Sequence, residues 1–125
     1  MNEAQVYSQH DFCRPVMRLD SDGYVYDGLQ MNRCARVDGG GTVYRDDYGH
    51  QVAGMVDLSN GHVYRGLFSN SSDYLGMVDS DGNVRRSTWG ETWGGSDGEI
   101  YGCVEGGSYD MRMRAGAAAL CLGYL

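Results

Sequence analysis

The chain of 125 residues contains no lysine, a single proline and only two phenylalanines. Its ten cationic side chains are all arginines, and 17 acidic side chains outnumber them, so the formal charge is −7. This balance argues against an electrostatic contact with DNA, RNA or an anionic membrane, because binding phosphates requires a surplus of cations. The lack of lysine also excludes Schiff-base chemistry and the phosphate-binding lysine of nucleotide-binding loops.

Long apolar runs are lacking as well. The first 17 residues are interrupted by His10, Asp11 and Arg14 where a secretory signal would need an apolar core. The most apolar segment, Ala115–Leu125, is too short for a membrane helix, which needs about 20 residues. We therefore expect a cytoplasmic protein without a signal peptide or transmembrane segment, folded as one domain over residues 1–125.

The four cysteines lack the spacing of a metal site. Cys13, Cys34, Cys103 and Cys121 form no C-x-x-C pair, and no second pair of ligands accompanies His10 and Cys13. In a cytoplasmic protein we expect reduced, mostly buried thiols. The sequence thus predicts no metal, no cofactor and no catalytic residue, with a small cysteine-dependent enzyme as a remote alternative.

Glycine, in contrast, is abundant, with 20 residues, and many of these mark a repeated motif. Turn sequences close with Gly23, Gly41, Gly61, Gly82 and Gly98, at intervals of 16 to 21 residues. Two residues after each glycine stands a β-branched residue: Val25, Val43, Val63, Val84 and Ile100. A tyrosine follows in four copies (Tyr26, Tyr44, Tyr64 and Tyr101), and Arg85 replaces it in the other. Val6-Tyr7 is a further copy whose turn is missing.

This motif predicts β-hairpins. Asp-Gly and Asn-Gly favour the backbone angles of tight hairpin turns, and valine and tyrosine suit the strands. The apolar residue before each turn and the valine after it can share one face, which puts the tyrosines on the other. We expect a core of Val6, Leu19, Val25, Val37, Val43, Val56, Val63, Val78, Val84 and Ile100. With no helix between strands, the hairpins must assemble as an antiparallel radial or barrel-like array.

The end of the chain differs from the hairpin repeats, which extend over about residues 6–108. Alternation in Tyr109–Arg114 predicts a half-buried strand. Ala115–Leu122 is almost wholly apolar and predicts a short buried helix, packed in the centre of the array.

The D-x-D-G-x-V-Y hairpins, the G-x-V before the aspartate and the closing A-G-A-A-A-L-x-L resemble the β-flower proteins. That family of uncharacterised bacterial proteins arranges four or five hairpins as petals around an axis. The resemblance covers about Val6–Leu125 and implies an all-β fold of about five petals. It implies no activity and carries over no site residue. Irregular stretches such as Gly28–Cys34 and Thr88–Gly94 depart from the pattern.

Calcium binding is the first chemical alternative that the repeats suggest. Asp20-Ser21-Asp22-Gly23 and its copy at 79–82 resemble fragments of EF-hand loops. The twelfth positions, where such a loop has glutamate, are Met31 and Gly90. The aspartates are therefore interpreted as turn residues.

The aromatic residues favour a non-enzymatic binding or structural module. Tyrosine and tryptophan provide large contact areas at a low entropic cost. The candidate contact residues are Trp89, Trp93, Tyr26, Tyr44, Tyr64 and Tyr101. A glycan- or peptide-binding protein that uses Trp89 and Trp93 is an alternative, and open strand edges would permit a homo-oligomer.

Overall fold

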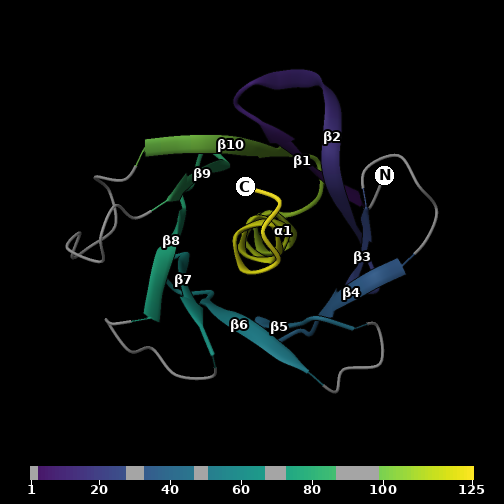
Figure 1. Cartoon of the computed structure of the whole chain (residues 1–125), viewed down its shortest axis with the longest axis vertical. Helices are drawn as coiled ribbons and strands as arrows, with labels where there is room; N and C mark the ends of the chain where they lie inside the picture. The colour runs from purple at the N-terminus through teal and green to yellow at the C-terminus, as the bar shows by residue number, and fades with distance from the viewer. Residues whose placement is uncertain (1–2, 28–32, 47–50, 67–72, 87–98) are drawn as a thin grey trace.

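The protein is an all-β closed barrel with one helix at its centre (Figure 1). The computed structural model describes residues 3–27, 33–46, 51–66, 73–86 and 99–125. The strands are β1 (Glu3–Ser8), β2 (Asp11–Asp20), β3 (Tyr24–Asp27), β4 (Arg33–Val37), β5 (Thr42–Tyr44), β6 (Val52–Asp57), β7 (His62–Arg65), β8 (Tyr74–Val78), β9 (Asn83–Arg86) and β10 (Glu99–Glu105), and the helix is α1 (Tyr109–Cys121). Each strand pairs antiparallel with its neighbours in the chain, and β1 pairs with β10 to close the ring. The predicted fold class is confirmed.

In four hairpins the predicted cross-strand pairs are present. Leu19 lies opposite Val25 across β2 and β3, and the same pairing recurs as Val37–Val43, Val56–Val63 and Val78–Val84. All eight side chains are buried. Since strand side chains alternate between faces, one face of every hairpin lines the barrel interior and the other faces outward.

The side chains of the turn aspartates accept hydrogen bonds from backbone N–H groups of the same turn, as expected for turn residues. Asp20 Oδ1 accepts hydrogen bonds from the backbone N–H groups of Asp22 (2.9 Å) and Tyr24 (3.0 Å). Asp38 and Asp79 each bind the second and fourth following N–H groups in the same way. The turn then closes on a glycine with positive φ, which is 91° at Gly23.

The fifth hairpin is formed by the two ends of the chain. Gly102-Cys103-Val104-Glu105 in β10 matches the G-x-V-acid pattern of the other hairpins, and Val104 pairs with Val6 in β1. The prediction that Ile100 lies in the core is therefore wrong: Ile100 is 37% exposed, and Val104 is the valine of β10 that is buried, opposite Val6. The expected turn at Ser96–Gly98 lies outside the described residues.

Helix α1 begins earlier than the sequence predicts, so the strand expected over Tyr109–Arg114 is wrong. Ser108 caps the helix by accepting a hydrogen bond from the N–H of Met111 (3.2 Å), and Asp110 lies in the first turn. The alternating pattern has another cause: strands surround the helix, so both Met111 and Met113 are buried. Over the described part of the chain, no helix is long and apolar enough to cross a membrane.

The predicted core is otherwise confirmed, and α1 fills the centre of the ring, as expected. The buried helical residues are mainly small, and Ala115, Ala117, Ala118 and Ala119 are fully buried among the strand valines. Gly116 packs so closely that a Cβ atom there would lie 2.4 Å from Cγ2 of Val78. A wider helix would not fit this barrel.

Candidate functional site

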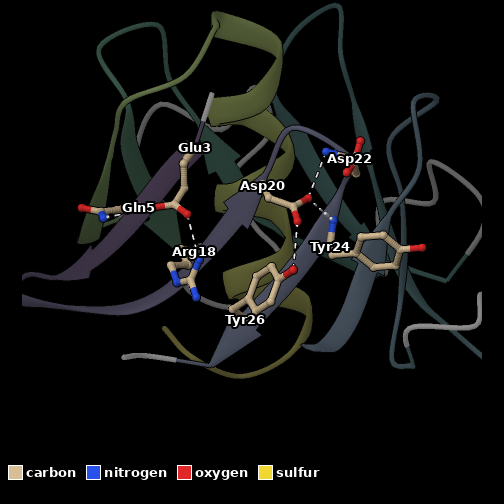
Figure 2. Close-up of polar contacts among 7 residues, drawn as sticks. All are labelled: Glu3, Gln5, Arg18, Asp20, Asp22, Tyr24 and Tyr26. Atoms are coloured by element: carbon tan, nitrogen blue, oxygen red, sulfur yellow. Dashed lines mark hydrogen bonds and ion pairs between the residues drawn. The ribbon is translucent and has the colours of Figure 1, made fainter. Parts of the chain in front are cut away.

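The outer face of β2 to β5 carries a group of aromatic and cationic side chains. Tyr26 and Tyr44 follow the buried valines of their hairpins and are half-buried, as predicted for the outer face. Tyr26 donates a hydrogen bond to Asp20 Oδ2 (3.0 Å), and Tyr44 donates one to Asp38 Oδ2 (3.3 Å). Figure 2 shows Asp20 between its turn and Tyr26. Each aspartate thus fixes a turn through one oxygen and a tyrosine through the other.

Arg85 takes over this position in the β8–β9 hairpin. Its Nε lies 3.3 Å from Asp79 Oδ2, where the β2–β3 and β4–β5 hairpins have a tyrosine hydroxyl. A guanidinium can donate a hydrogen bond to a carboxylate as a tyrosine hydroxyl does. The exception in the sequence motif therefore keeps the same contact.

Arginines lie over the tyrosine rings. The guanidinium carbons of Arg18, Arg33 and Arg36 lie 4.3, 4.4 and 5.9 Å from the ring centres of Tyr26, Tyr24 and Tyr44. These separations are within the range of cation–π attraction. We name these six residues on β2 to β5 the tyrosine–arginine surface: Arg18, Tyr24, Tyr26, Arg33, Arg36 and Tyr44.

Strand register builds this surface. Arg18 is the cross-strand partner of Tyr26, and Arg36 is the partner of both Tyr24 and Tyr44 on its two neighbouring strands. Glu3 of β1 extends the polar network by an ion pair with Arg18 (2.8 Å; Figure 2). Direct neighbours on one face of a sheet interact most strongly, so the pairing holds the rings and guanidinium groups in fixed positions.

Tyr26 and Tyr44 stay protonated over the neutral range. Burial is the main cause that raises the pKa of Tyr26 and of Tyr44 above 10.0, and the acceptor carboxylates, Asp20 and Asp38, raise it further. The neighbouring arginines oppose this effect. The hydroxyl groups are therefore hydrogen-bond donors, and none of them is poised as a base at neutral pH.

The other two candidate tyrosines lie elsewhere. Tyr64 of β7 packs edge-on against Tyr74 of β8, with ring centres 5.6 Å apart, and His62 meets Tyr74 at 5.4 Å. Tyr101 is in β10 and precedes the buried Val104 in the chain. The guanidinium carbon of Arg86 lies 5.7 Å from the centre of its ring. Tyr101 thus does not belong to the tyrosine column that follows the valines. Tyr7 belongs to it and donates a hydrogen bond to Gln5 (2.7 Å).

The sequence prediction therefore identified part of this surface. Tyr26 and Tyr44 were expected, whereas Tyr24, Arg18, Arg33 and Arg36 were not. The missed signal was the arginine that precedes the apolar-Asp pair, as in Arg18-Leu19-Asp20 and Arg36-Val37-Asp38. Trp89 and Trp93 lie outside the described residues.

The cysteines are free and less buried than expected. Cys13 is exposed, and Cys34, Cys103 and Cys121 are half-buried, so the expectation of mostly buried thiols is wrong. Burial raises the pKa of Cys121 to about 12, and burial and Glu105 raise that of Cys103. Cys121 is accordingly a thiol at neutral pH, and a thiol is a poor nucleophile.

Acidic groups do not converge on a metal-binding arrangement in the part of the chain that the structure describes. A shallow depression lies at the seam between β1 and β10, lined by Glu3, Gln5, Glu105 and Gly106. It occupies the place where the other hairpins have a turn, because the chain leaves β10 here to enter α1.

No family model, curated protein or solved structure matches this chain.

Proposed function

We propose that the protein is a non-enzymatic binding module that contacts a partner protein or peptide through the tyrosine–arginine surface. The observation that carries the proposal is the set of ring–guanidinium pairs on β2 to β5, held by hydrogen bonds to Asp20 and Asp38. Tyrosine and arginine are the residue types, with tryptophan, that contribute most often to binding energy at protein interfaces.

Preorganisation supports this reading. Side chains that are already fixed lose little entropy when a partner binds, so more of the contact energy appears as affinity. Tyr26 is held by Asp20 at its hydroxyl and by Arg18 over its ring, and Tyr44 has the corresponding partners in Asp38 and Arg36.

The same stacking disfavours a sugar platform on these tyrosines. A sugar ring stacks on an uncovered aromatic face, whereas Arg18 and Arg33 lie over the rings of Tyr26 and Tyr24. A polypeptide partner can instead contact the outer planes of the guanidinium groups and their N–H donors. The glycan alternative therefore depends on Trp89 and Trp93 rather than on this surface.

The test is a screen of the intact protein against a peptide library and a glycan array. A peptide ligand should lose about tenfold in affinity in Arg36→Ala and more in Tyr26→Ala/Tyr44→Ala. Tyr109→Ala is the matched control, because Tyr109 is the most exposed described tyrosine and lies on α1, away from the surface. Circular dichroism confirms that each variant is folded.

Other outcomes of this screen point elsewhere. Glycan binding that disappears in Trp89→Ala/Trp93→Ala would replace the proposal by the sugar-binding alternative. Peptide binding that is equal in Arg36→Ala, Tyr109→Ala and the wild type would remove the tyrosine–arginine surface as the site. Silence on both arrays would leave a purely structural module, the reading that the β-flower resemblance also permits.

A further inference from the structure

Arg45 and Arg65 occupy the same position in neighbouring hairpins. Each is the second residue after a buried valine, as is Arg86 in the next hairpin: Val43-Tyr44-Arg45, Val63-Tyr64-Arg65 and Val84-Arg85-Arg86. All three arginines are exposed. Arg65 and Arg86 end β7 and β9, and Arg45 directly follows β5, so all three lie at the end of the barrel away from the turns. Helix α1 lies in the centre of the ring (Figure 1), and its last residue, Cys121, is at this end, where its Sγ lies 3.8 Å from the carbonyl oxygen of Tyr64.

Cys121 packs on β6, the strand between those that lead to Arg45 and Arg65. Gly54 of β6 pairs with Val43 on one side and with Arg65 on the other, so β6 separates the strands that lead to Arg45 and Arg65. A Cβ atom on Gly54 would lie 2.4 Å from Cys121 Sγ, so the thiol packs directly on the β6 backbone. Both arginines act on it electrostatically, since their charges lower the pKa of Cys121 against the larger effect of burial.

Neither guanidinium group has a hydrogen-bond or ion-pair partner within the described residues, whereas several other arginines do. Arg18 pairs with Glu3, Arg114 with Asp110, and Arg112 donates to a backbone carbonyl. Arg86 shows what this position can bind: it donates a hydrogen bond to the carbonyl oxygen of Leu125 (2.7 Å).

We propose that Arg45 and Arg65 bind an anionic group, a phosphate or a carboxylate, over Cys121 at this mouth of the barrel. Two guanidinium groups that approach from either side of β6 can each donate two hydrogen bonds to such a group. The site is separate from the tyrosine–arginine surface and does not depend on the proposed function. The alternative is that the two arginines bind no ligand and only stabilise the fold. The last turn of α1 has no basic residue, so their charges would then offset the partial negative charge at the C-terminal end of the helix.

The experiment is an NMR titration of the intact protein with inorganic phosphate and, separately, with acetate, at constant ionic strength set by chloride. We expect saturable shifts of the Gly54 and Cys121 amide signals with at least one probe. Arg45→Gln and Arg65→Gln should each weaken binding about tenfold, because each removes one charged donor pair. Arg14→Gln, at an exposed position of β2 outside both proposed sites, is the matched control and should bind as the wild type does. The stronger probe identifies phosphate or carboxylate as the preferred group.

The proposal is overturned if neither probe produces a saturable shift, or if Arg14→Gln weakens binding as much as the other two variants. A lower melting temperature of Arg45→Gln and Arg65→Gln in chloride, with no saturable anion binding by the wild type, would also overturn it. That result would assign the pair to the helix end alone. Overlay of the variant spectra with that of the wild type outside the mouth verifies that the fold is retained.

Discussion

Asp20 illustrates how much of this protein depends on single short side chains. One carboxylate oxygen accepts hydrogen bonds from two backbone N–H groups of the turn, and the other accepts a hydrogen bond from the hydroxyl group of Tyr26. Asp38 repeats the arrangement with Tyr44. A residue that builds the turn therefore also orients an outward side chain, which couples the stability of a hairpin to the shape of the candidate surface.

Gly116 sets the allowed width of the central helix. Alanine normally favours a helix over glycine by about 1 kcal/mol. Here the new methyl group would lie 2.4 Å from Cγ2 of Val78 and 3.1 Å from Cγ2 of Val84. We expect Gly116→Ala to lower the free energy of unfolding by about 1–3 kcal/mol, the usual range for an overpacked core. Urea unfolding followed by circular dichroism measures it.

Two companion variants isolate the cause of that loss. Gly39→Ala adds the same methyl group where nothing lies within 4 Å, so it should be nearly neutral. Val78→Ala removes the clashing atoms, so the double variant Gly116→Ala/Val78→Ala should be more stable than the sum of the single effects predicts. Strict additivity would show that overlap with Val78 is not the reason.

Cys121 should make the fold sensitive to alkali. Burial raises its pKa from the ordinary 9.0 to about 12, so above pH 9 the unfolded chain releases a proton that the folded protein retains. Its contribution to stability is complete below pH 9 and is lost as the pH rises toward 12. Urea unfolding between pH 8 and 11 should therefore show a shallower decline for Cys121→Ala than for the wild type.

The matched control is Cys13→Ala, because Cys13 is exposed. Its stability should fall with pH in parallel with that of the wild type. The decline that persists in Cys121→Ala is expected from tyrosines such as Tyr26 and Tyr44, whose pKa values are also raised by burial. Parallel curves for Cys121→Ala and the wild type would contradict the assignment to Cys121.

At the scale of elements, α1 forms the centre of the hydrophobic core. Leu120 is 7% exposed and packs with the buried strand residues. A carboxylate at this position would be buried without a partner, a change that costs several kcal/mol. We expect Leu120→Asp to abolish cooperative thermal unfolding, whereas Leu120→Met should lose no more than about 1.5 kcal/mol. A cooperative melt of Leu120→Asp near the wild-type temperature would rule out a stabilising role for the central helix.

The hairpins could be predicted because their signals are local. A glycine that needs a positive φ, an aspartate before it and a valine after it all lie within a few residues, and the Leu19–Val25 pairing follows from the turn between them. The start of α1 could not be predicted so well. Met111 and Met113 imitate strand alternation, since a helix surrounded by strands buries residues on every side.

The fifth hairpin and the tyrosine–arginine surface depend on contacts between distant parts of the chain. Val6 meets Val104 only when the barrel closes, so nothing near Ile100 indicates that this residue stays outside the core. The stacking of Arg33 on Tyr24 depends on the register and on the bulge between β3 and β4. Neither register nor bulges can be derived from the composition of a single strand.

At the scale of the whole molecule, the hairpins are linked into a continuous ring. The carbonyl oxygen of Gly23 accepts a hydrogen bond from Val37 of the next hairpin (2.7 Å). Gly41, Gly61 and Gly82 repeat this bond with Val56, Val78 and Val104. Closure through β1 and β10 leaves no open edge among the described strands. A homo-oligomer formed by pairing of open strand edges would therefore have no free strand among them.

A closed ring should unfold as one unit, unlike an open array of repeats, whose units can unfold separately. Val6 at the seam and Val56 across the barrel are both almost fully buried, and α1 packs against both of their strands. We expect Val6→Ala and Val56→Ala each to lose about 2 kcal/mol, the lower part of the range for a truncated core residue. Each variant should retain a single transition that is identical by circular dichroism and by NMR hydrogen exchange. A second, earlier transition confined to β1 and β10 in Val6→Ala would instead mean that the seam opens independently, and that four continuous hairpins around α1 suffice for a stable fold.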